Sequence, residues 1–152
     1  MAKFKFQMSN ILSLKENIAT QKEQEFGKAM QALALEKQKL EKLELDKSNS
    51  IARLRGEMGI KIKPTEFQQI QQYIEFLKIK IEEQKNIIKT AQKFVEFKRH
   101  ELIEATKEKK MLEKLKEKKY EEYIEEEKVS EQKTVDEIVS YKYAPDKKEK
   151  VS

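Results

Sequence analysis

Few side chains in this sequence have the type and spacing that catalysis or metal binding requires. The 152-residue chain contains no Cys and a single His, His100. An imidazole can act as a general base or a metal ligand, but no phosphate loop or metal-spaced cluster lies near His100. The adjacent carboxylates Glu82 and Glu83 would need a cleft to work as an acid–base pair, and a helix surface provides none. These residues indicate solvated positions, so we expect no enzyme activity, no metal and no cofactor.

A lysine-rich run between Lys107 and Lys119 raises the question of nucleic-acid binding. Glutamates interrupt this run, and the glutamate-rich segment 121–127 follows it. Neighbouring opposite charges weaken a phosphate-binding track, and the same objection applies to a basic membrane-binding helix. We therefore favour a solvated helix face over nucleic acid. The alternative, an RNA-binding helix, predicts steep salt dependence of binding.

The composition is typical of a long helix or coiled coil rather than a globular domain. Charged residues make up 40% of the chain, with no Trp, three Gly and two Pro. The N-terminal residues 1–8 lack the apolar core of a signal peptide, and no run of about 18 apolar residues occurs. The lack of Cys fits a reducing compartment. We expect a cytoplasmic protein without a membrane span.

A repeat between Phe67 and Leu112 predicts the helix that positions most of these charged and polar side chains. Its apolar residues recur in alternating steps of three and four, interrupted only by Gln84, Lys98 and Lys109. A repeat that averages about 3.5 residues keeps one face of a helix against a partner helix. The apolar positions of this seam are Phe67, Ile70, Ile74, Leu77, Ile81, Ile88, Ala91, Val95, Leu102, Ala105 and Leu112.

A first helix is expected over about 9–56, with a less regular seam. From Ile18 to Met30 the spacing advances in steps of four, which predicts a stutter that locally unwinds the supercoil. The apolar positions are Ile11, Leu14, Ile18, Phe26, Met30, Leu33, Leu40, Leu43, Ile51 and Leu54.

A turn over about 57–64 separates the two helices, because Gly56 and Gly59 favour a helix end and Pro64 follows them. Thr65 and Gln68 have the spacing of a capping box, so a second helix is expected over 65–143, with a flexible tail over 144–152. A short connection makes the helices antiparallel neighbours. The predicted fold is all-α, one coiled-coil domain over 1–152 that forms a long antiparallel two-helix hairpin. A parallel or antiparallel dimer that buries the same seam is an open alternative.

Folding the chain at this turn gives a predicted register. Gln84 falls opposite Lys37, Lys98 opposite Glu23, and the large Met30 opposite the small Ala91. Leu112 is then level with Ser9, so the C-terminal helix overhangs and residues from about 116 to 143 have no cover. A single exposed helix is marginal in water, so we expect the overhang to need a partner.

A second apolar edge lies beside the seam and exceeds what a two-helix hairpin needs. If Phe67 is heptad position a, Tyr73, Ile87 and Phe94 fall at g, and Phe76 and Phe97 fall at c. Long side chains of the first helix could cover them. We favour docking of another protein or of a second copy, because contiguous exposed apolar residues mark interaction sites.

Several segments of the chain resemble the flagellar export protein FliJ family of bacterial type III secretion. The resemblance spans nearly the whole chain, and its most specific part is Glu131-Gln-Lys-Thr-Val-Asp-Glu137. The other matching segments are the run from Phe4 to Glu16, the turn at Gly59-Ile60, the stretch from Phe67 to Leu77 and the stretch from Leu112 to Lys118.

This resemblance implies a cytoplasmic antiparallel coiled coil, similar to the central stalk of rotary ATPases and peripheral to the inner face of the cell membrane through protein partners. Its implied partners are the hexameric export ATPase, the cytoplasmic domain of the membrane export gate and export chaperones. The residues that match the ATPase-side motif are Glu131, Gln132, Lys133, Asp136 and Glu137. Tyr73, Leu77 and Leu43 match gate-side positions, to which we add Phe76 and Phe97 of the apolar edge. The chain departs from the family at Asp46 and Ser50, which stand where aromatics can occur. The alternative function is a generic coiled-coil scaffold or chaperone-like adaptor that binds through the aromatic edge.

Overall fold

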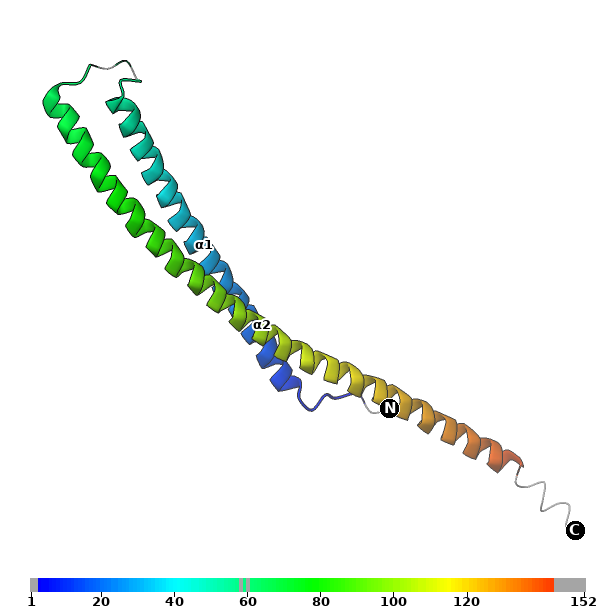
Figure 1. Cartoon of the computed structure of the whole chain (residues 1–152). Coiled ribbons are helices and arrows are strands. Elements are labelled where there is room, and N and C mark those ends of the chain that lie inside the picture. The colour runs from blue at the N-terminus through cyan, green and yellow to red at the C-terminus, as the bar shows by residue number, and fades with distance from the viewer. Residues whose placement is uncertain (1–2, 58, 60, 144–152) are drawn as a thin grey trace, which may run out of the picture. The chain divides into compact units, whose positions relative to one another are not determined.

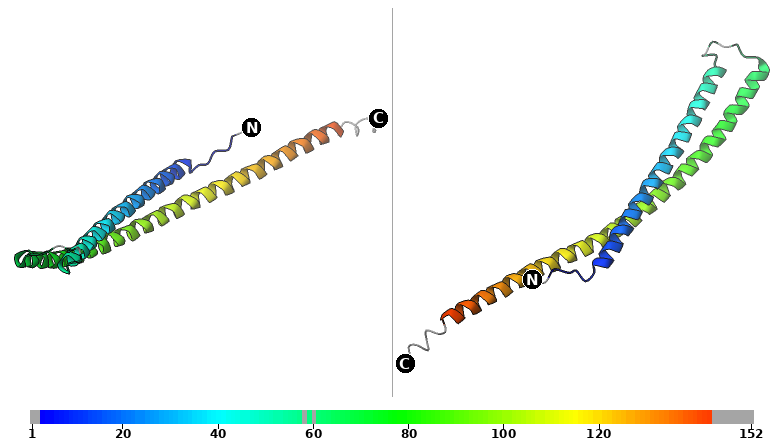
Figure 2. Two further views of the ribbon diagram at one scale, coloured as in Figure 1. Left: turned by 90° about the horizontal axis from the view of Figure 1, so that it is seen from above. Right: turned by 180° about the vertical axis from the view of Figure 1, so that it is seen from behind.

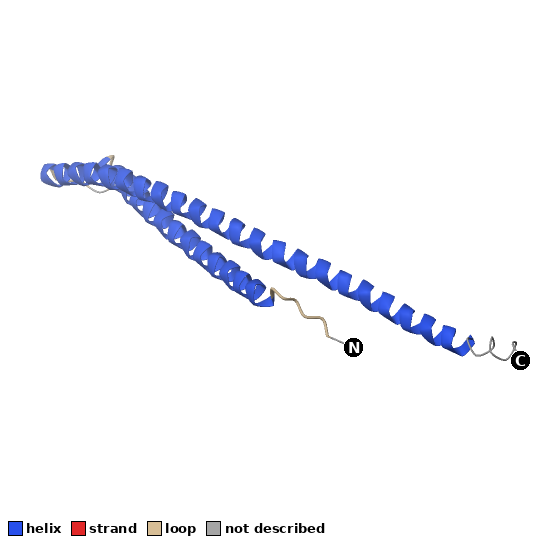
Figure 3. Cartoon of the chain, turned by 90° about the horizontal axis from the view of Figure 1, so that it is seen from below, coloured by secondary structure: helices blue, strands red, loops and turns tan. Residues whose placement is uncertain are grey.

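Two long helices form the fold, in agreement with the predicted all-α hairpin (Figure 1). The computed structural model describes residues 3–57, 59 and 61–143. Helix α1 comprises Ser9–Leu54 and helix α2 comprises Pro64–Tyr143, and the described residues contain no strand (Figure 3). The predicted flexible tail, 144–152, lies outside the described residues.

The contacts within the chain divide it into two compact units, where the sequence indicated one domain. One unit combines Met1–Asn17 with Thr106–Ser152, and the other is Ile18–Ala105. In the unit Ile18–Ala105, α1 and α2 run antiparallel and side by side on either side of the turn (Figure 2). We call this unit the hairpin unit and the other the terminal unit.

Helix α1 ends at Leu54, two residues before the predicted end, because Gly56 forms a left-handed cap. Gly56 has a φ of 69°, and its N–H donates to the carbonyl of Arg53 at 3.1 Å. The N–H of Glu57 donates to the carbonyl of Ala52 at 3.1 Å. This pair of hydrogen bonds is the Schellman arrangement, in which a glycine at positive φ satisfies the last carbonyls of a helix.

Helix α2 begins at Pro64, so the predicted capping box at Thr65 is wrong. The N–H of Phe67 donates to the carbonyl of Lys63 at 2.9 Å, which makes Lys63 the capping residue and Pro64 the first helical residue. Proline suits this position because its fixed φ is helical and its missing N–H has no intrahelical acceptor. Thr65 consequently lies within the first turn.

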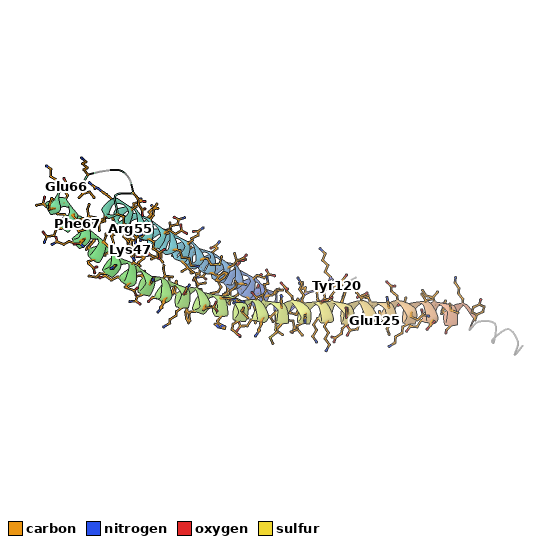
Figure 4. The ribbon with its side chains drawn as sticks, turned by 45° about the horizontal axis from the view of Figure 1, so that its top comes forward. Lys47, Arg55, Glu66, Phe67, Tyr120 and Glu125 are labelled. Atoms are coloured by element: carbon orange, nitrogen blue, oxygen red, sulfur yellow. The ribbon has the colours of Figure 1, made fainter. Side chains whose placement is uncertain are left out.

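The predicted seam of α2 forms the core of the hairpin unit. Its buried members are Ile74, Leu77, Ile81, Gln84, Ile88 and Ala105, and Ile70, Ala91, Val95, Lys98 and Leu102 are half-buried. Phe67, at the start of the helix (Figure 4), is the exception because it remains exposed. The interruption at Gln84 is buried together with its apolar neighbours.

The predicted seam of α1 is wrong between Ile18 and Met30. Ala29 is 3% exposed, whereas the adjacent Met30 is 48% exposed. The buried and half-buried residues keep steps of three and four without a stutter, through Ala19, Lys22, Phe26, Ala29, Leu33, Glu36, Leu40 and Leu43. Alanine leaves room for the facing helix, and the stem of a lysine can lie along an apolar surface while its charge reaches water.

In the terminal unit, the residues before α1 extend the cover of α2 further than predicted. Leu12 is buried, whereas Ile11 and Leu14 are exposed. The ring of Phe4 lies 5.3 Å from that of Tyr120 and 5.5 Å from that of Tyr123. We call Lys3–Met8 the N-terminal strap. The uncovered part of α2 therefore begins after about residue 127 rather than at 116.

Candidate partner-binding surfaces

The five residues of the predicted apolar edge are exposed on α2 in the hairpin unit. Their exposed fractions range from 42% at Tyr73 to 58% at Phe97. Long side chains of α1 therefore leave about half of each residue open to solvent. We call Tyr73, Phe76, Ile87, Phe94 and Phe97 the aromatic edge.

Ring stacking and a hydrogen bond order the first two rings of the aromatic edge. The rings of Tyr73 and Phe76 stack with centroids 6.2 Å apart. The hydroxyl of Tyr73 donates to Asp46 Oδ2, and this hydrogen bond raises the pKa of Tyr73. Asp46 thus fixes the orientation of an aromatic ring on the facing helix.

Two of the predicted gate-side residues belong to the core rather than to the surface. Leu77 is 1% exposed, so a partner could contact it only by opening the helix pair. Leu43 is half-buried on the seam of α1. The accessible members of that prediction are therefore Tyr73, Phe76 and Phe97.

Four charged side chains, two lysines and two glutamates, connect α1 and α2 beside Phe94 and Phe97 of the aromatic edge. Lys98 Nζ lies 3.2 Å from Glu25 Oε2 and 3.2 Å from Glu101 Oε2. Lys22 Nζ lies 3.4 Å from Glu25 Oε2 and 3.2 Å from Glu101 Oε2. Predicted opposite Glu23, Lys98 instead pairs with Glu25. We call Lys22, Glu25, Lys98 and Glu101 the charge quartet.

The charge quartet shifts the protonation equilibria of its members. Hydrogen bonding to Lys98 lowers the pKa of Glu25. The hydrogen bonds to Glu25 and then Glu101 raise the pKa of Lys98. At Glu101 burial alone would raise the pKa, but Lys98 and Lys22 outweigh it and the pKa is lowered. The ammonium of Lys98 also lies 5.4 Å and 5.6 Å from the ring centroids of Phe94 and Phe97.

The buried Gln84 forms a further polar contact across the hairpin. Its Nε2 donates to the carbonyl of Glu36 at 2.9 Å and to the Glu36 carboxylate. Predicted opposite Lys37, Gln84 thus faces the adjacent residue. The donation from Gln84, followed by that from Lys39, lowers the pKa of Glu36. The described residues contain no buried side-chain nitrogen or oxygen without a partner.

The predicted ATPase-side residues lie on the C-terminal part of α2, in the terminal unit. Every residue from Lys128 to Tyr143 is exposed, including Glu131, Gln132, Lys133, Asp136 and Glu137. Figure 4 shows Tyr120 and, further along the helix, Glu125. Gln132 Nε2 donates to Asp136 Oδ1 at 3.1 Å, one helical turn away.

Three exposed aliphatic residues lie among and directly after these polar positions and were not singled out from the sequence. Val135 and Ile138 are each 51% exposed, and Val139 is 45% exposed. Their spacing puts them on one face of the helix. That spacing could have identified them, but the surrounding charges hid it. The C-terminal surface, which we define as residues 128–143, therefore combines a polar motif with an aliphatic face.

Among the described residues, no group of three or more His, Cys, Asp or Glu side chains could hold a metal ion. His100 is exposed on α2. In the lysine-rich run, Glu108 pairs with Lys15 at 2.7 Å and Lys119 with Glu122 at 3.4 Å. None of the described helices has the length and hydrophobicity needed to span a membrane.

Comparison with known proteins places most of the chain within one family model. A model described as "Flagellar FliJ protein" matches residues 4–148. No curated protein sequence matches the chain significantly. Among solved structures, the chain is similar to CT670 from Chlamydia trachomatis, described as a YscO homolog, with a TM-score of 0.63 and 22% identity. The alignment covers 96% of this chain and 99% of that chain, and at this identity the likeness concerns the fold alone.

Proposed function

The chain belongs to the flagellar FliJ protein family, which makes it a component of flagellar protein export, and we propose that it is a non-catalytic cytoplasmic stalk. In this proposal it couples the hexameric export ATPase to the cytoplasmic domain of the membrane export gate and escorts export chaperones. The C-terminal surface binds the ATPase, and the accessible residues Tyr73, Phe76 and Phe97 bind the gate.

The complete exposure of the C-terminal surface carries the proposal. A helix of this length whose side chains are all exposed gains nothing from tertiary packing, and helices are marginal without such packing. A ring of subunits that surrounds the helix would bury Val135, Ile138 and Val139 while leaving Glu131 and Asp136 within reach of basic side chains. Such a site holds the helix by contact and performs no chemistry itself.

A variant that ends at Glu127 tests the contact with the ATPase. This end point keeps Tyr120 and Tyr123, the residues on which Phe4 of the strap packs. We expect the shortened protein to keep the helicity of the remaining residues and to lose its stimulation of the export ATPase. Stimulation equal to that of the full chain would contradict the proposal.

Substitutions in the full chain separate loss of contact from loss of length. We expect Val135→Asp with Ile138→Asp to reduce ATPase stimulation by about tenfold or more, because charges replace the aliphatic contact face. Met111→Asp is the matched control, since Met111 is also exposed but lies outside the C-terminal surface. ATPase rates at equal protein concentration provide the measurement.

The second candidate, a coiled-coil scaffold or chaperone-like adaptor, is favoured by the exposure of the aromatic edge. This candidate predicts that Phe76→Glu with Phe97→Glu abolishes partner binding and that the variant ending at Glu127 changes nothing. Pull-downs with the gate domain and an export chaperone, together with the ATPase assay, distinguish the two functions.

A further inference from the structure

The aromatic edge is part of a second line of residues with coiled-coil spacing. Steps of three and four, the spacing of the buried seam, connect Tyr73, Phe76, Lys80, Glu83, Ile87, Thr90, Phe94 and Phe97, and all eight are exposed. A helix with two such lines can pack against two helices, one on each line. In the hairpin unit α1 packs only against the buried seam. The second line therefore has the spacing to receive another helix.

The two ends of the second line are alike, although its central residues differ. An aromatic pair begins it and another ends it, and Lys85 is midway between them. The pairs are three heptads apart, about 31 Å along the helix. A two-fold axis at this midpoint would bring Tyr73 of one copy against Phe97 of the other, and Phe76 against Phe94. An isologous dimer requires a surface with this self-complementarity.

The charges on the line favour an antiparallel over a parallel second copy. A parallel pair in register would oppose Lys80 to Lys80 and Glu83 to Glu83, and like charges repel across a helix interface. The antiparallel pair instead opposes Lys80 to Thr90 and Glu83 to Ile87. Within each copy Lys80 Nζ lies 3.2 Å from Glu83 Oε2, so the charged centre of the line is already neutralised.

Cation–π contacts and the charge quartet hold the rings in place before a second copy arrives. Lys80 Nζ lies 5.5 Å from the ring centroid of Phe76. Lys98 contacts Phe94 and Phe97 while its charge is shared by Glu25 and Glu101. Side chains that are already ordered lose less entropy on association, which favours binding.

We propose that two copies of this chain associate as an antiparallel, two-fold symmetric dimer through the second line of α2, with Tyr73 and Phe76 packed against Phe97 and Phe94 of the other copy. The dimer covers the residues proposed above to bind the gate, so dimerisation and gate binding exclude each other. The proposal does not depend on the contact between the C-terminal surface and the ATPase.

The absence of Cys from the chain allows a direct test of this arrangement. Lys80→Cys and Thr90→Cys variants are prepared separately and then mixed under oxidising conditions. The antiparallel dimer predicts a disulfide-linked dimer in the mixture and little from either variant alone. A disulfide in each variant alone would indicate a parallel pair and overturn the proposal. Lys89→Cys, on another face of α2, is the control and should not cross-link.

Sedimentation of the unmodified chain over a range of concentrations tests the association itself. We expect a monomer–dimer equilibrium that Phe76→Glu with Phe97→Glu weakens by about a hundredfold or more. Circular dichroism checks that this variant stays helical, and Met111→Glu, an exposed change outside the line, should leave the equilibrium unaltered. A chain that is monomeric at every concentration would overturn the dimer and leave the proposed ATPase contact intact.

Discussion

At the scale of single residues, polar contacts set which parts of the two helices meet. Gln84 and Lys98 interrupt the apolar seam, yet each faces a glutamate on α1: Glu36 for Gln84 and Glu25 for Lys98. A buried amide or ammonium without a partner is costly, so a slipped register that separates these pairs would be penalised. The charge quartet therefore favours the observed register over its neighbours.

The pKa shifts of the charge quartet predict a stability plateau between acid and alkaline limits. Because the pKa values of Glu25 and Glu101 are lowered from 4.5, their contribution is present above that pH and is lost as the pH falls through the folded values. Because the pKa of Lys98 is raised from 10.5, its contribution is present below that pH and is lost as the pH rises through the folded value. Thermal unfolding followed by circular dichroism from acid to alkaline pH measures this plateau. Glu25→Gln with Glu101→Gln should reduce the loss of thermal stability at acid pH. An unchanged loss would contradict this origin.

The adjacent residues Leu77 and Phe76 should differ strongly in their effects on stability. Leu77 is 1% exposed and Phe76 is 51% exposed. We expect Leu77→Ala to lower the free energy of unfolding by about 2–5 kcal/mol, because it leaves a cavity in the seam. Phe76→Ala should cost about 0.5 kcal/mol or less, as at other exposed sites. Urea unfolding of both variants makes the comparison, and equal losses would show that the aromatic edge is part of the core.

At the scale of the elements, the two helices contribute side chains of different size to the seam. Helix α2 supplies the large aliphatic residues, whereas α1 supplies two alanines, Ala19 and Ala29, among larger side chains. Close packing favours a small residue where a large one faces it across the interface. This division explains why α1 keeps an unbroken heptad although its large apolar residues follow another spacing.

Substitutions at Ala29 and Met30 test this division. We expect Ala29→Leu to destabilise the hairpin unit by about 1–3 kcal/mol through overpacking. Met30→Leu, at the neighbouring exposed position, should be almost neutral. Thermal unfolding of the two variants at one protein concentration provides the measurement. A destabilising Met30→Leu with a neutral Ala29→Leu would instead support the seam expected from the sequence, in which Met30 faces α2.

At the scale of the whole molecule, the chain comprises two compact units. The hairpin unit contains the seam, the charge quartet and the aromatic edge. The terminal unit contains the N-terminal strap and the C-terminal surface. In the terminal unit the strap, rather than α1, packs on the aromatic residues Tyr120 and Tyr123, and residues 128–143 are exposed.

Removing the strap's aromatic rings should loosen α2 locally. We expect Phe4→Ala with Phe6→Ala to speed amide hydrogen exchange over residues 116–127 by about tenfold, because local opening becomes easier where packing is lost. Exchange over residues 74–88, in the hairpin unit, should not change and is the internal control. Hydrogen exchange with mass spectrometry measures both regions, and unchanged exchange over 116–127 would show that the strap contributes nothing to α2.

The sequence by itself determined the two helices, the glycine-rich turn and the seam of α2, because these depend on local propensity and on periodicity within one segment. It also identified the aromatic edge and the polar motif near the C-terminus as surface features. Only the tertiary structure decided which residues of α1 face α2 and that Phe4 packs on Tyr120 and Tyr123. Those features depend on how side chains from distant segments fill one shared space, which the spacing within either segment does not specify.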